Sequence, residues 1–394
     1  MMSIVGITVI LLLCLLLSKD RRLISWQTIL IGLTLQAGLA FLVLKTDLGK
    51  NLFSALSATI LNLLSVADQG GHFAFGNLYD QFGFVFAFKL SGAIIFICAL
   101  TAFLYRIGVL HRVLVLGAWV LQKLLRVSGA EALANVSSAL VGQVESALPL
   151  KPYFPKLSNS QFFAIMTGGM STISAALMAT YTGLGIPANY LLAANLMGIP
   201  AGLVIAKMLY PSDPEESLQT LPEPEQPDSA NLIDATVHGA QEGLKISLGV
   251  ISLVIAFVSL VALIDQGLGY FKLSLAQIFG YIFYPLAWII GAPSEEAGLI
   301  GGLIGKKIAI NEFVAYLDLK NLIERNALSA RGVMLSCFAI CGFANFGSVA
   351  IQLGAFTQIL PERRRDFAEM GLMALVAGAL ASCLSACWAN LFFD

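Results

Sequence analysis

Long apolar stretches recur along the whole chain, and several of them reach 18 residues or more. In a helix, about 20 apolar residues cross the hydrocarbon core of a bilayer. Charged residues make up only 12% of the 394 residues, whereas soluble proteins carry about 25%. Each span must satisfy its backbone hydrogen bonds without water, which an α-helix does within one segment. The sequence therefore predicts an all-α polytopic membrane protein.

About eight segments are predicted to cross the membrane, namely residues 3–18, 23–44, 84–110, 161–182, 188–208, 243–265, 331–357 and 367–392. Residues 50–66 and 111–126 are amphipathic with polar flanks, so we expect them to lie at the membrane surface. Residues 273–291 correspond to the second of these in order, and residues 68–82 are expected to form a loop.

Two other segments, 131–157 and 294–318, carry polar islands between apolar arms. The arms of the first have about ten residues each, which is too short to span. Irregular backbone at membrane depth is tolerated only where protein or a polar cavity covers it. We therefore predict two re-entrant hairpins whose polar islands meet at one site in the bilayer.

One structural unit is expected to occur twice. The pattern before a Pro/Glu-rich linker is repeated after it, which predicts N-terminal scaffold spans and an interfacial helix at 1–83, a first repeat at 84–208, a cytoplasmic linker at 209–242 and a second repeat at 243–394. Three full crossings in each repeat would place the second copy upside down. Inverted repeats with broken helices are typical of secondary transporters, which bind substrate near the midplane.

Basic clusters at 19–22, 111–126 and 363–365 fall on the cytoplasmic side if both termini lie outside. The first cluster follows the first apolar run, so that run is expected to be a span and not a signal peptide. The predicted location is the cytoplasmic (inner) membrane. A net charge of -1 gives no reason to expect a nucleic-acid partner, and the three histidines lie outside the apolar cores of the spans. We expect neither an enzyme nor a cofactor.

The polar islands carry the candidate chemistry. An ionisable residue inside a membrane is costly and usually functional. We expect Glu145 and Glu312 to face a polar site and to accept hydrogen bonds from hydroxyl or amine groups of a substrate. Further donors and acceptors would come from Gln143, Asn311, Asn345 and Ser348.

Internal pairing is the alternative for these carboxylates, for example of Glu312 with Lys306 or Lys307. Glu131 and Glu296 stand at the starts of the hairpins and are better candidates for pairing of this kind. A cation site would use free oxygen atoms where helices break, for which the hydroxyls of Ser138 and Thr172 and the carbonyls of Val141 and Ile173 are placed. Those hydroxyls can equally bond back to their own helix.

Several motifs are specific. The pattern G-x-K-x-x-x-N-E-F-V-A stands intact at 305–315. It is accompanied by Gly-Gln-x-Glu at 142–145, Lys-Pro-Tyr at 151–153, Pro-Ser-Glu-Glu-Ala at 293–297 and Gly-Phe-Ala-Asn-Phe-Gly-Ser at 342–348. With these motifs in this order, the chain resembles the concentrative nucleoside transporters over nearly its whole length.

The resemblance implies a homotrimer in the lipid bilayer that imports nucleosides with H+ or Na+ by an elevator movement. In that family, the residues at Gln143 and Glu145 hold the nucleobase, with a contribution from Val144. The resemblance assigns the ribose hydroxyls to Glu312, Asn345 and Ser348, and the lining of the site to Leu177 and Phe343. A sodium ion, in sodium-coupled members, would lie at Ser138, Val141, Thr172 and Ile173.

Two positions depart from the family pattern. Val144 stands where Ser or Thr is frequent, so the base preference is expected to differ. Ser138 stands where sodium-coupled members often carry Asn, which favours protons, carried by Glu145 or Glu312, and leaves sodium open. The alternative functions are a transporter of free nucleobases or another small polar metabolite and, more remotely, a membrane receptor.

Overall fold

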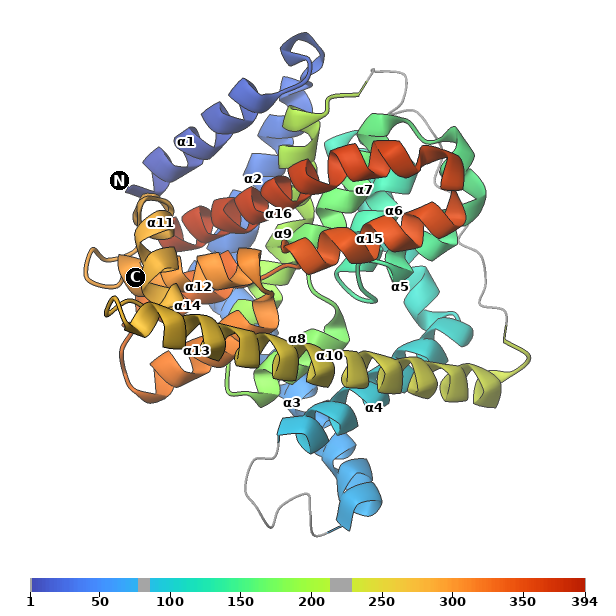
Figure 1. The fold of residues 1–394 in the computed structure, drawn as a ribbon. Helices are drawn as coiled ribbons and strands as arrows, with labels where there is room; N and C mark the ends of the chain where they lie inside the picture. The colour runs from blue at the N-terminus through green and yellow to red at the C-terminus, as the bar shows by residue number, and fades with distance from the viewer. Residues whose placement is uncertain (1, 77–85, 213–228, 394) are drawn as a thin grey trace.

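The computed structural model describes residues 2–76, 86–212 and 229–393, and no strand occurs among them (Figure 1). The α-helices are α1 (Met2–Leu17), α2 (Trp26–Lys45), α3 (Asp47–Phe75), α4 (Phe86–Arg106), α5 (Val109–Leu125), α6 (Gly129–Ser138), α7 (Asn159–Ser171), α8 (Ala175–Gly183), α9 (Ala188–Leu209), α10 (Leu232–Gly269), α11 (Leu275–Ile289), α12 (Ala297–Ala309), α13 (Glu312–Glu324), α14 (Ala330–Ile340), α15 (Phe346–Ile359) and α16 (Arg364–Phe392). Short 3-10 helices occupy Arg21–Leu23, Glu145–Lys156 (η3) and Pro361–Arg363. The prediction of an all-α polytopic membrane protein is confirmed.

In the described part of the chain, seven helical segments are long and apolar enough to cross a membrane: Trp26–Lys45, Asp47–Phe75, Ala87–Arg106, Asn159–Gly183, Ala188–Leu209, Leu232–Gly269 and Pro361–Phe392. Six of these coincide with predicted spans. The other two predicted spans are built from shorter apolar helices, α1 and the pair α14–α15. The seventh candidate is α3, which the sequence placed at the membrane surface.

The predicted loop after α3 is wrong for its first part. Helix α3 continues to Phe75, and residues 77–82 lie outside the described residues. The start of α4 supports the extra turns, because the ring of Phe75 packs at a tilt against that of Phe88, with centroids 4.7 Å apart. Asp68 also lies 3.5 Å from Lys89. Tertiary contacts thus override the weak helix propensity of the glycines near this end.

The linker between the repeats is shorter than the predicted 209–242. Helix α10 begins at Leu232, where Asn231 caps it by accepting from the backbone N–H of Asp234 at 2.9 Å. The predicted span at 243–265 is therefore the later part of a helix of 38 residues.

Both re-entrant hairpins were located correctly, with small errors at their ends. The first consists of α6 and η3, and the second of α12 and α13, which continues to Glu324. Prolines at 149, 152 and 155 remove backbone donors from the second arm of the first hairpin, which is a 3-10 helix.

Each span that follows a hairpin is broken by a short non-helical segment. The breaks comprise residues 172–174 between α7 and α8, and residues 341–345 between α14 and α15. Gly168 and Gly169 do not belong to the first break, because both are helical. They admit close neighbours instead: a Cβ on Gly169 would lie 3.0 Å from the Cβ of Gln143.

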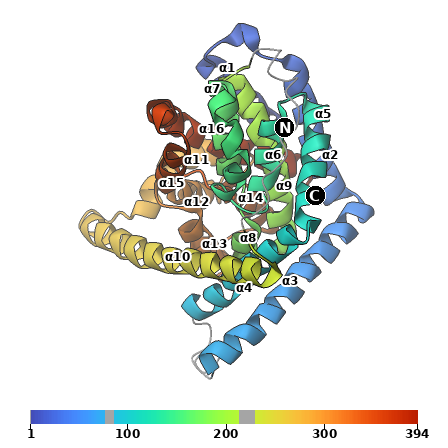
Figure 2. The ribbon, with the colours of Figure 1, turned by 90° about the vertical axis from the view of Figure 1, so that its right-hand side faces the viewer.

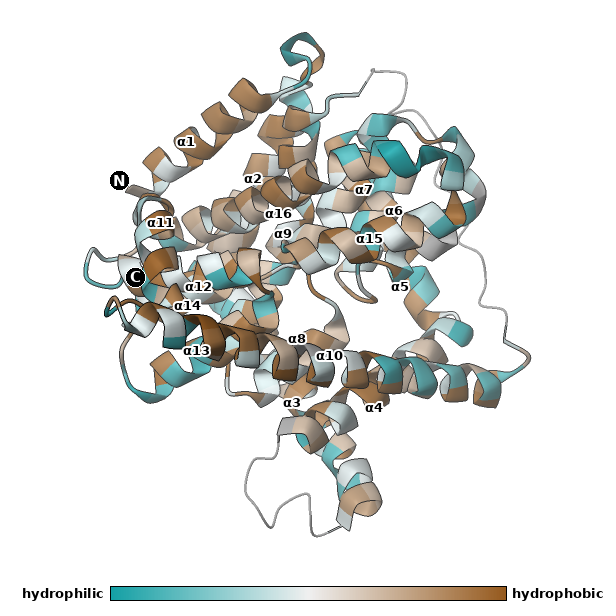
Figure 3. Ribbon diagram, in the orientation of Figure 1, coloured by the Kyte–Doolittle hydropathy of each residue, from teal (hydrophilic) through white to brown (hydrophobic). Residues whose placement is uncertain are grey.

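Helices α7, α9 and α16 pack against one another and form the buried centre of the molecule. Around it, α10 packs on α4, and α3 and α10 extend along the periphery in both views (Figures 1 and 2). The outer face of α10 is apolar and uncovered, with Ile255 and Leu263 each 64% exposed. Hydrophilic residues gather at the start of α10 and at the turn into α16 (Figure 3). Large exposed apolar faces of this kind are suited to lipid or to another subunit.

Candidate functional site

The two polar islands are joined through Ser348 and Asn345 of the second broken span. Gln143, at the tip of the first hairpin, donates from Nε2 to Oγ of Ser348 at 3.2 Å. The backbone N–H of Ser348 donates to Oδ1 of Asn345 at 2.7 Å, and Nδ2 of Asn345 donates to Oε2 of Glu312 at 2.9 Å. A continuous path of hydrogen bonds therefore joins the first hairpin, the second broken span and the second hairpin.

Helix starts position the residues of this path. Glu312 is the first residue of α13, and the preceding Asn311 caps that helix by accepting from the N–H of Val314 at 2.9 Å. Asn345 caps α15 in the same way. Because the N-terminal end of a helix carries partial positive charge, it favours the Glu312 carboxylate there. Asn311 thus supports the site by capping the helix that carries Glu312.

Tyr181 is a partner that sequence reasoning missed. Its phenol donates to Oε1 of Glu312 at 3.1 Å. Tyr181 lies in the last turn of α8, and its side chain is fully buried. The ring stacks on Tyr316 with centroids 4.3 Å apart. A tyrosine in an apolar span gives no signal of its own, so only the fold shows that it joins the site.

Gln352 also escaped prediction. It donates from Nε2 to Oε1 of Gln143 at 3.3 Å and to the carbonyl of Met166 at 3.2 Å. Its position one helical turn after Ser348 on α15 was an available signal, because residues four apart share a helix face. The Gln143 amide is thus held from both ends.

Glu145 differs from Glu312 in being exposed, and within the described residues no side chain donates to its carboxylate. It lies over Gly142, whose φ of +124° favours glycine and at which a Cβ would lie 2.6 Å from Oε2 of Glu145. Val144 and Leu177 are half-buried and Phe343 is buried. The hairpin therefore presents an exposed carboxylate that can accept further hydrogen bonds.

The four residues of the candidate cation site lie around the first break. The hydroxyls of Ser138 and Thr172 are 2.9 Å apart, and both reach the carbonyl of Gly168, at 3.4 Å and 2.9 Å. The backbone N–H of Ile173 donates to Oδ1 of Asn195 at 2.8 Å. Each hydroxyl donates to a carbonyl of its own helix, as the alternative expected. The two hydroxyls also bond to each other, and this contact joins α6 to the break after α7. Val141 is half-buried beside them in the chain.

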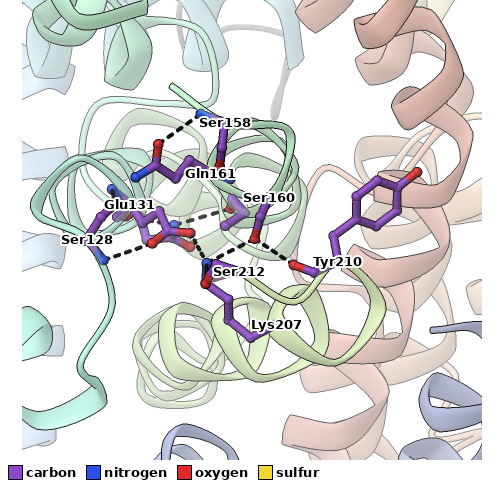
Figure 4. A network of polar contacts seen from close by, with 10 residues as sticks. Ser128, Glu131, Ser158, Ser160, Gln161, Lys207, Tyr210 and Ser212 are labelled. Carbon is purple, nitrogen blue, oxygen red and sulfur yellow. Dashed lines mark hydrogen bonds and ion pairs between the residues drawn. The ribbon is translucent and has the colours of Figure 1, made fainter. Parts of the chain in front are cut away.

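Internal pairing is confirmed for Glu131 and Glu296. Glu131 closes a capping box with Ser128 and forms a buried ion pair with Lys207 of α9, which also donates to Ser160 and Ser212 (Figure 4). Lys207 was missed, although a lysine inside an apolar span calls for a buried partner.

Glu296 accepts from the backbone N–H and Oγ of Ser329, at 2.9 Å and 3.1 Å. Each of these glutamates therefore ties the start of its hairpin to a neighbouring span.

Pairing of Glu312 with either neighbouring lysine is not what the structure shows. Lys306 pairs with Asp318 on the same hairpin, and Lys307 donates to backbone carbonyls and to Ser382. A cavity of about 630 Å³ lies beside Lys306, between α11, α12 and α13, and none of the predicted site residues lines it. The candidate site is therefore the polar junction of the two islands, and this cavity is separate from it.

The two helix breaks touch each other through their backbones. Gly342 has a φ of +105°, and a Cβ there would lie 2.6 Å from the carbonyl oxygen of Met170 and 3.0 Å from the carbonyl carbon of Ser171. Atoms that close would overlap, so only glycine fits this position.

We expect Gly342→Ala to abolish transport, because both the backbone angle and the space forbid the methyl group. Uptake and surface expression in cells, measured together, separate lost activity from lost protein. The matched control is Gly354→Ala in α15, where a Cβ meets nothing within 4 Å. Transport by Gly342→Ala at the level of that control would contradict the close packing of the two breaks.

Two similarly ordered repeats with broken spans, two re-entrant hairpins and a polar junction between them define a secondary transporter. Sequence models of known families agree. The Na+ dependent nucleoside transporter C-terminus matches residues 190–390, its N-terminus matches residues 5–78, and a nucleoside recognition (gate) model matches residues 87–188. The chain belongs to this family, the concentrative nucleoside transporters.

Two bacterial permeases match this chain over almost their full length. The putative nucleoside permease NupX of Escherichia coli is 36% identical over 100% of this chain and 98% of its own. The nucleoside permease NupC of Helicobacter pylori is 35% identical over 99% and 97%. The solved structure of CNTnw in an inward-facing, substrate-bound state superposes with a TM-score of 0.95, at 37% identity, over 100% of this chain and 99% of that one. The family consists of transporters and not of enzymes.

Proposed function

We propose that this protein is a cation-coupled symporter that imports nucleosides across the cytoplasmic membrane and binds them at the junction of Gln143 and Glu312. The observation that carries the proposal is the hydrogen-bond path from Gln143 through Ser348 and Asn345 to Glu312, which draws on both repeats. A site shared between two repeats can be opened to either side when one part moves relative to the other.

The chemistry of the junction is suited to a nucleoside. The exposed carboxylate of Glu145 and the amide of Gln143 offer acceptors and a donor to the edge of a base, beside the half-buried Val144. The ribose hydroxyls would bond to Glu312, Asn345 and Ser348, which are buried and already aligned. The apolar side chains of Leu177 and Phe343 would cover the faces of the bound rings.

Uptake into proteoliposomes tests this function, with a panel of labelled nucleosides and with sodium and pH gradients varied independently. We expect saturable, gradient-stimulated uptake of at least one nucleoside. Competition by free bases as strong as by nucleosides would remove the ribose assignments and favour a nucleobase transporter. Binding of nucleosides without any flux would favour a receptor.

Sodium is the coupling ion that we propose, held by Ser138, Thr172 and the carbonyls of Val141 and Ile173. The support is that the hydrogen bonds at this break, within the described part of the chain, join hydroxyl, amide and carbonyl groups. Such oxygen atoms suit a metal cation, whereas none of them takes up a proton near neutral pH. Proton coupling would require a carboxylate, and Glu145 and Glu312 remain the carriers in that case.

Ser138→Ala is expected to raise the sodium concentration for half-maximal uptake by about 10-fold, the scale of one lost interaction of about 1.4 kcal/mol. The neighbouring Ser137 is the matched control, because its hydroxyl is equally buried but has no hydrogen-bond partner among the described residues. Equal sodium dependence in the Ser138→Ala and Ser137→Ala variants would exclude Ser138 from the ion site, and a dependence on pH alone would establish protons as the coupling ion.

The proposed assembly is a homotrimer in the inner membrane with both termini outside, working by an elevator movement. The buried centre around α7, α9 and α16 would move against the peripheral helices α3, α4 and α10, whose apolar faces are exposed. Light scattering on the purified protein tests the trimer. A reducible cross-link between the neighbouring helices α4 and α8 should stop uptake until it is reduced, and uptake unaffected by it would rule out this movement.

A further inference from the structure

The two helix breaks are surrounded by equivalent elements. At each break the first arm of a hairpin, the broken span and the span that follows converge. In the first repeat these elements contribute Ser138 of α6, Thr172 and Asn195 of α9. In the second repeat they contribute Lys307 of α12, the carbonyl of Cys341 and Ser382 of α16. The two breaks can therefore be compared group by group.

Neutral groups form the hydrogen bonds at the first break. Ser138 and Thr172 share a hydrogen bond and both reach the carbonyl of Gly168. Asn195 accepts from the N–H of Ile173 and donates to the carbonyl of Ala139, each at 2.8 Å. The carbonyl end of a helix carries partial negative charge, which none of these contacts balances with a positive group.

A lysine side chain enters the second break. Nζ of Lys307 donates to the carbonyls of Ala339 and Cys341, at 3.2 Å and 2.9 Å, and to Oγ of Ser382 at 2.9 Å. The residue is only 1% exposed. An ammonium group has three donors and no acceptor, so these three oxygen atoms satisfy it. Neutral oxygen atoms thus surround this buried cation in the manner of the ligands of a metal ion.

We infer that Lys307 is a tethered cation, which occupies at the second break the place that an exchangeable coupling cation occupies at the first. The inference rests on the proposed function, because that function supplies the first-break cation. Lys307 is a positioning residue: it fixes the carbonyl of Cys341, four residues before Asn345, which in turn holds Glu312. With Lys307 fixed to the chain, this pair of breaks would consequently carry one exchangeable cation together with each nucleoside.

Replacing Lys307 with alanine tests this role by chemical rescue. Lys307→Ala leaves the carbonyl oxygen atoms without their cation, so we expect KM for the nucleoside to rise by about 10- to 100-fold, the range found when a group that orients a ligand-binding side chain is removed. Methylammonium chloride should lower that KM again, because its ammonium group fits the vacated place. Choline chloride at the same ionic strength should not, because its quaternary nitrogen has no N–H to donate.

The adjacent lysine is the matched control. Lys306 pairs with Asp318 and does not contact the break, so Lys306→Ala should keep the KM of the parent protein and show no response to methylammonium. Lys307→Gln is the second variant, because a neutral amide of similar length preserves packing if the alanine variant does not fold. It too should raise KM, since the charge is lost. A parent-like KM in Lys307→Gln, or a folded Lys307→Ala whose raised KM methylammonium leaves unchanged, would overturn the inference.

Thermal unfolding separates this inference from the proposed function. A ligand that binds only the folded state raises its melting temperature, so methylammonium should stabilise Lys307→Ala relative to choline and leave the parent protein unchanged. This measurement needs no nucleoside. Absence of nucleoside uptake by the parent protein would reject the proposed function, whereas absence of selective stabilisation in a protein that does take up nucleosides would reject the tethered cation alone.

Discussion

Nucleoside uptake by a Glu312→Gln variant is expected to be about 100-fold weaker than by the parent protein. Hydrogen bonds to a charged group contribute about 1.5–3 kcal/mol each, and each 1.4 kcal/mol is a factor of ten in binding. The amide keeps the size of the side chain but removes the charge. It also turns one acceptor into a donor, which is mismatched to a ribose hydroxyl that donates.

The surroundings of Glu312 amplify this loss. Tyr181 and Asn345 both donate to its carboxylate, at 3.1 Å and 2.9 Å. An amide nitrogen in place of one oxygen would face one of these two groups: opposite Nδ2 of Asn345 it would meet another donor, and opposite Tyr181 it would force the phenol to accept instead of donate. The side chain is only 5% exposed, so water does not relieve the mismatch.

The measurement is concentration-dependent uptake in proteoliposomes, with the amount of folded transporter determined in parallel. Glu324→Gln is the matched control, because Glu324 is exposed at the other end of the same helix and forms an ion pair with Lys320 one turn earlier. Exposed pairs contribute about 1 kcal/mol or less, so that variant should transport normally. Uptake by Glu312→Gln within a factor of two or so of the control would remove Glu312 from the substrate site.

Stability is expected to fall by about 3–5 kcal/mol when Lys207 is replaced with methionine, because this leaves Glu131 as an uncompensated buried charge. The two side chains are 6% and 1% exposed. The pair connects the start of the first hairpin to α9, and Lys207 also donates to Ser160 at 3.1 Å and Ser212 at 2.9 Å (Figure 4). Loss of the ammonium group therefore frees three partners at once.

A double-mutant cycle measures this coupling. Thermal unfolding of Lys207→Met, Glu131→Gln and the combined variant should show that the combined loss is smaller than the sum of the two single losses, because the second change removes the charge that the first left unpaired. The control is Lys245→Met, which breaks an exposed pair with Glu242. Strictly additive losses of stability in the cycle would mean that the buried pair does not stabilise the hairpin. The same would follow if Lys207→Met lost no more stability than Lys245→Met.

Much of the architecture follows from hydropathy and from a few polar residues. Apolar stretches and the isolated charges Glu145 and Glu312 are enough to predict spans, hairpins and a shared site, because a membrane forbids unpaired polar groups except where they meet one another. Helix ends are less predictable. The glycines at 168 and 169 resemble a break in sequence, yet they lie inside α7 and allow neighbouring side chains to approach.

The partners of the polar residues are the least predictable part. Tyr181, Gln352 and Lys207 come from segments far along the chain from the groups they contact, and their sequence context is that of ordinary spans. Lys307 illustrates the difficulty: its proximity to Glu312 in sequence suggested an ion pair, but helix α12 directs it towards the other side, where backbone carbonyls receive it. Sequence separation fixes which residues are near in the chain and not which way they face.

The backbone contact at Gly342 has a consequence for the order of folding. Its partners Met170 and Ser171 are synthesised long before it, so the first break remains uncovered while the second repeat is still being made and inserted. Contacts between such distant residues form late. An insertion intermediate with a complete first repeat should therefore be the species most exposed to proteases and most dependent on chaperones, and premature stops after α9 should yield a chain that is rapidly degraded.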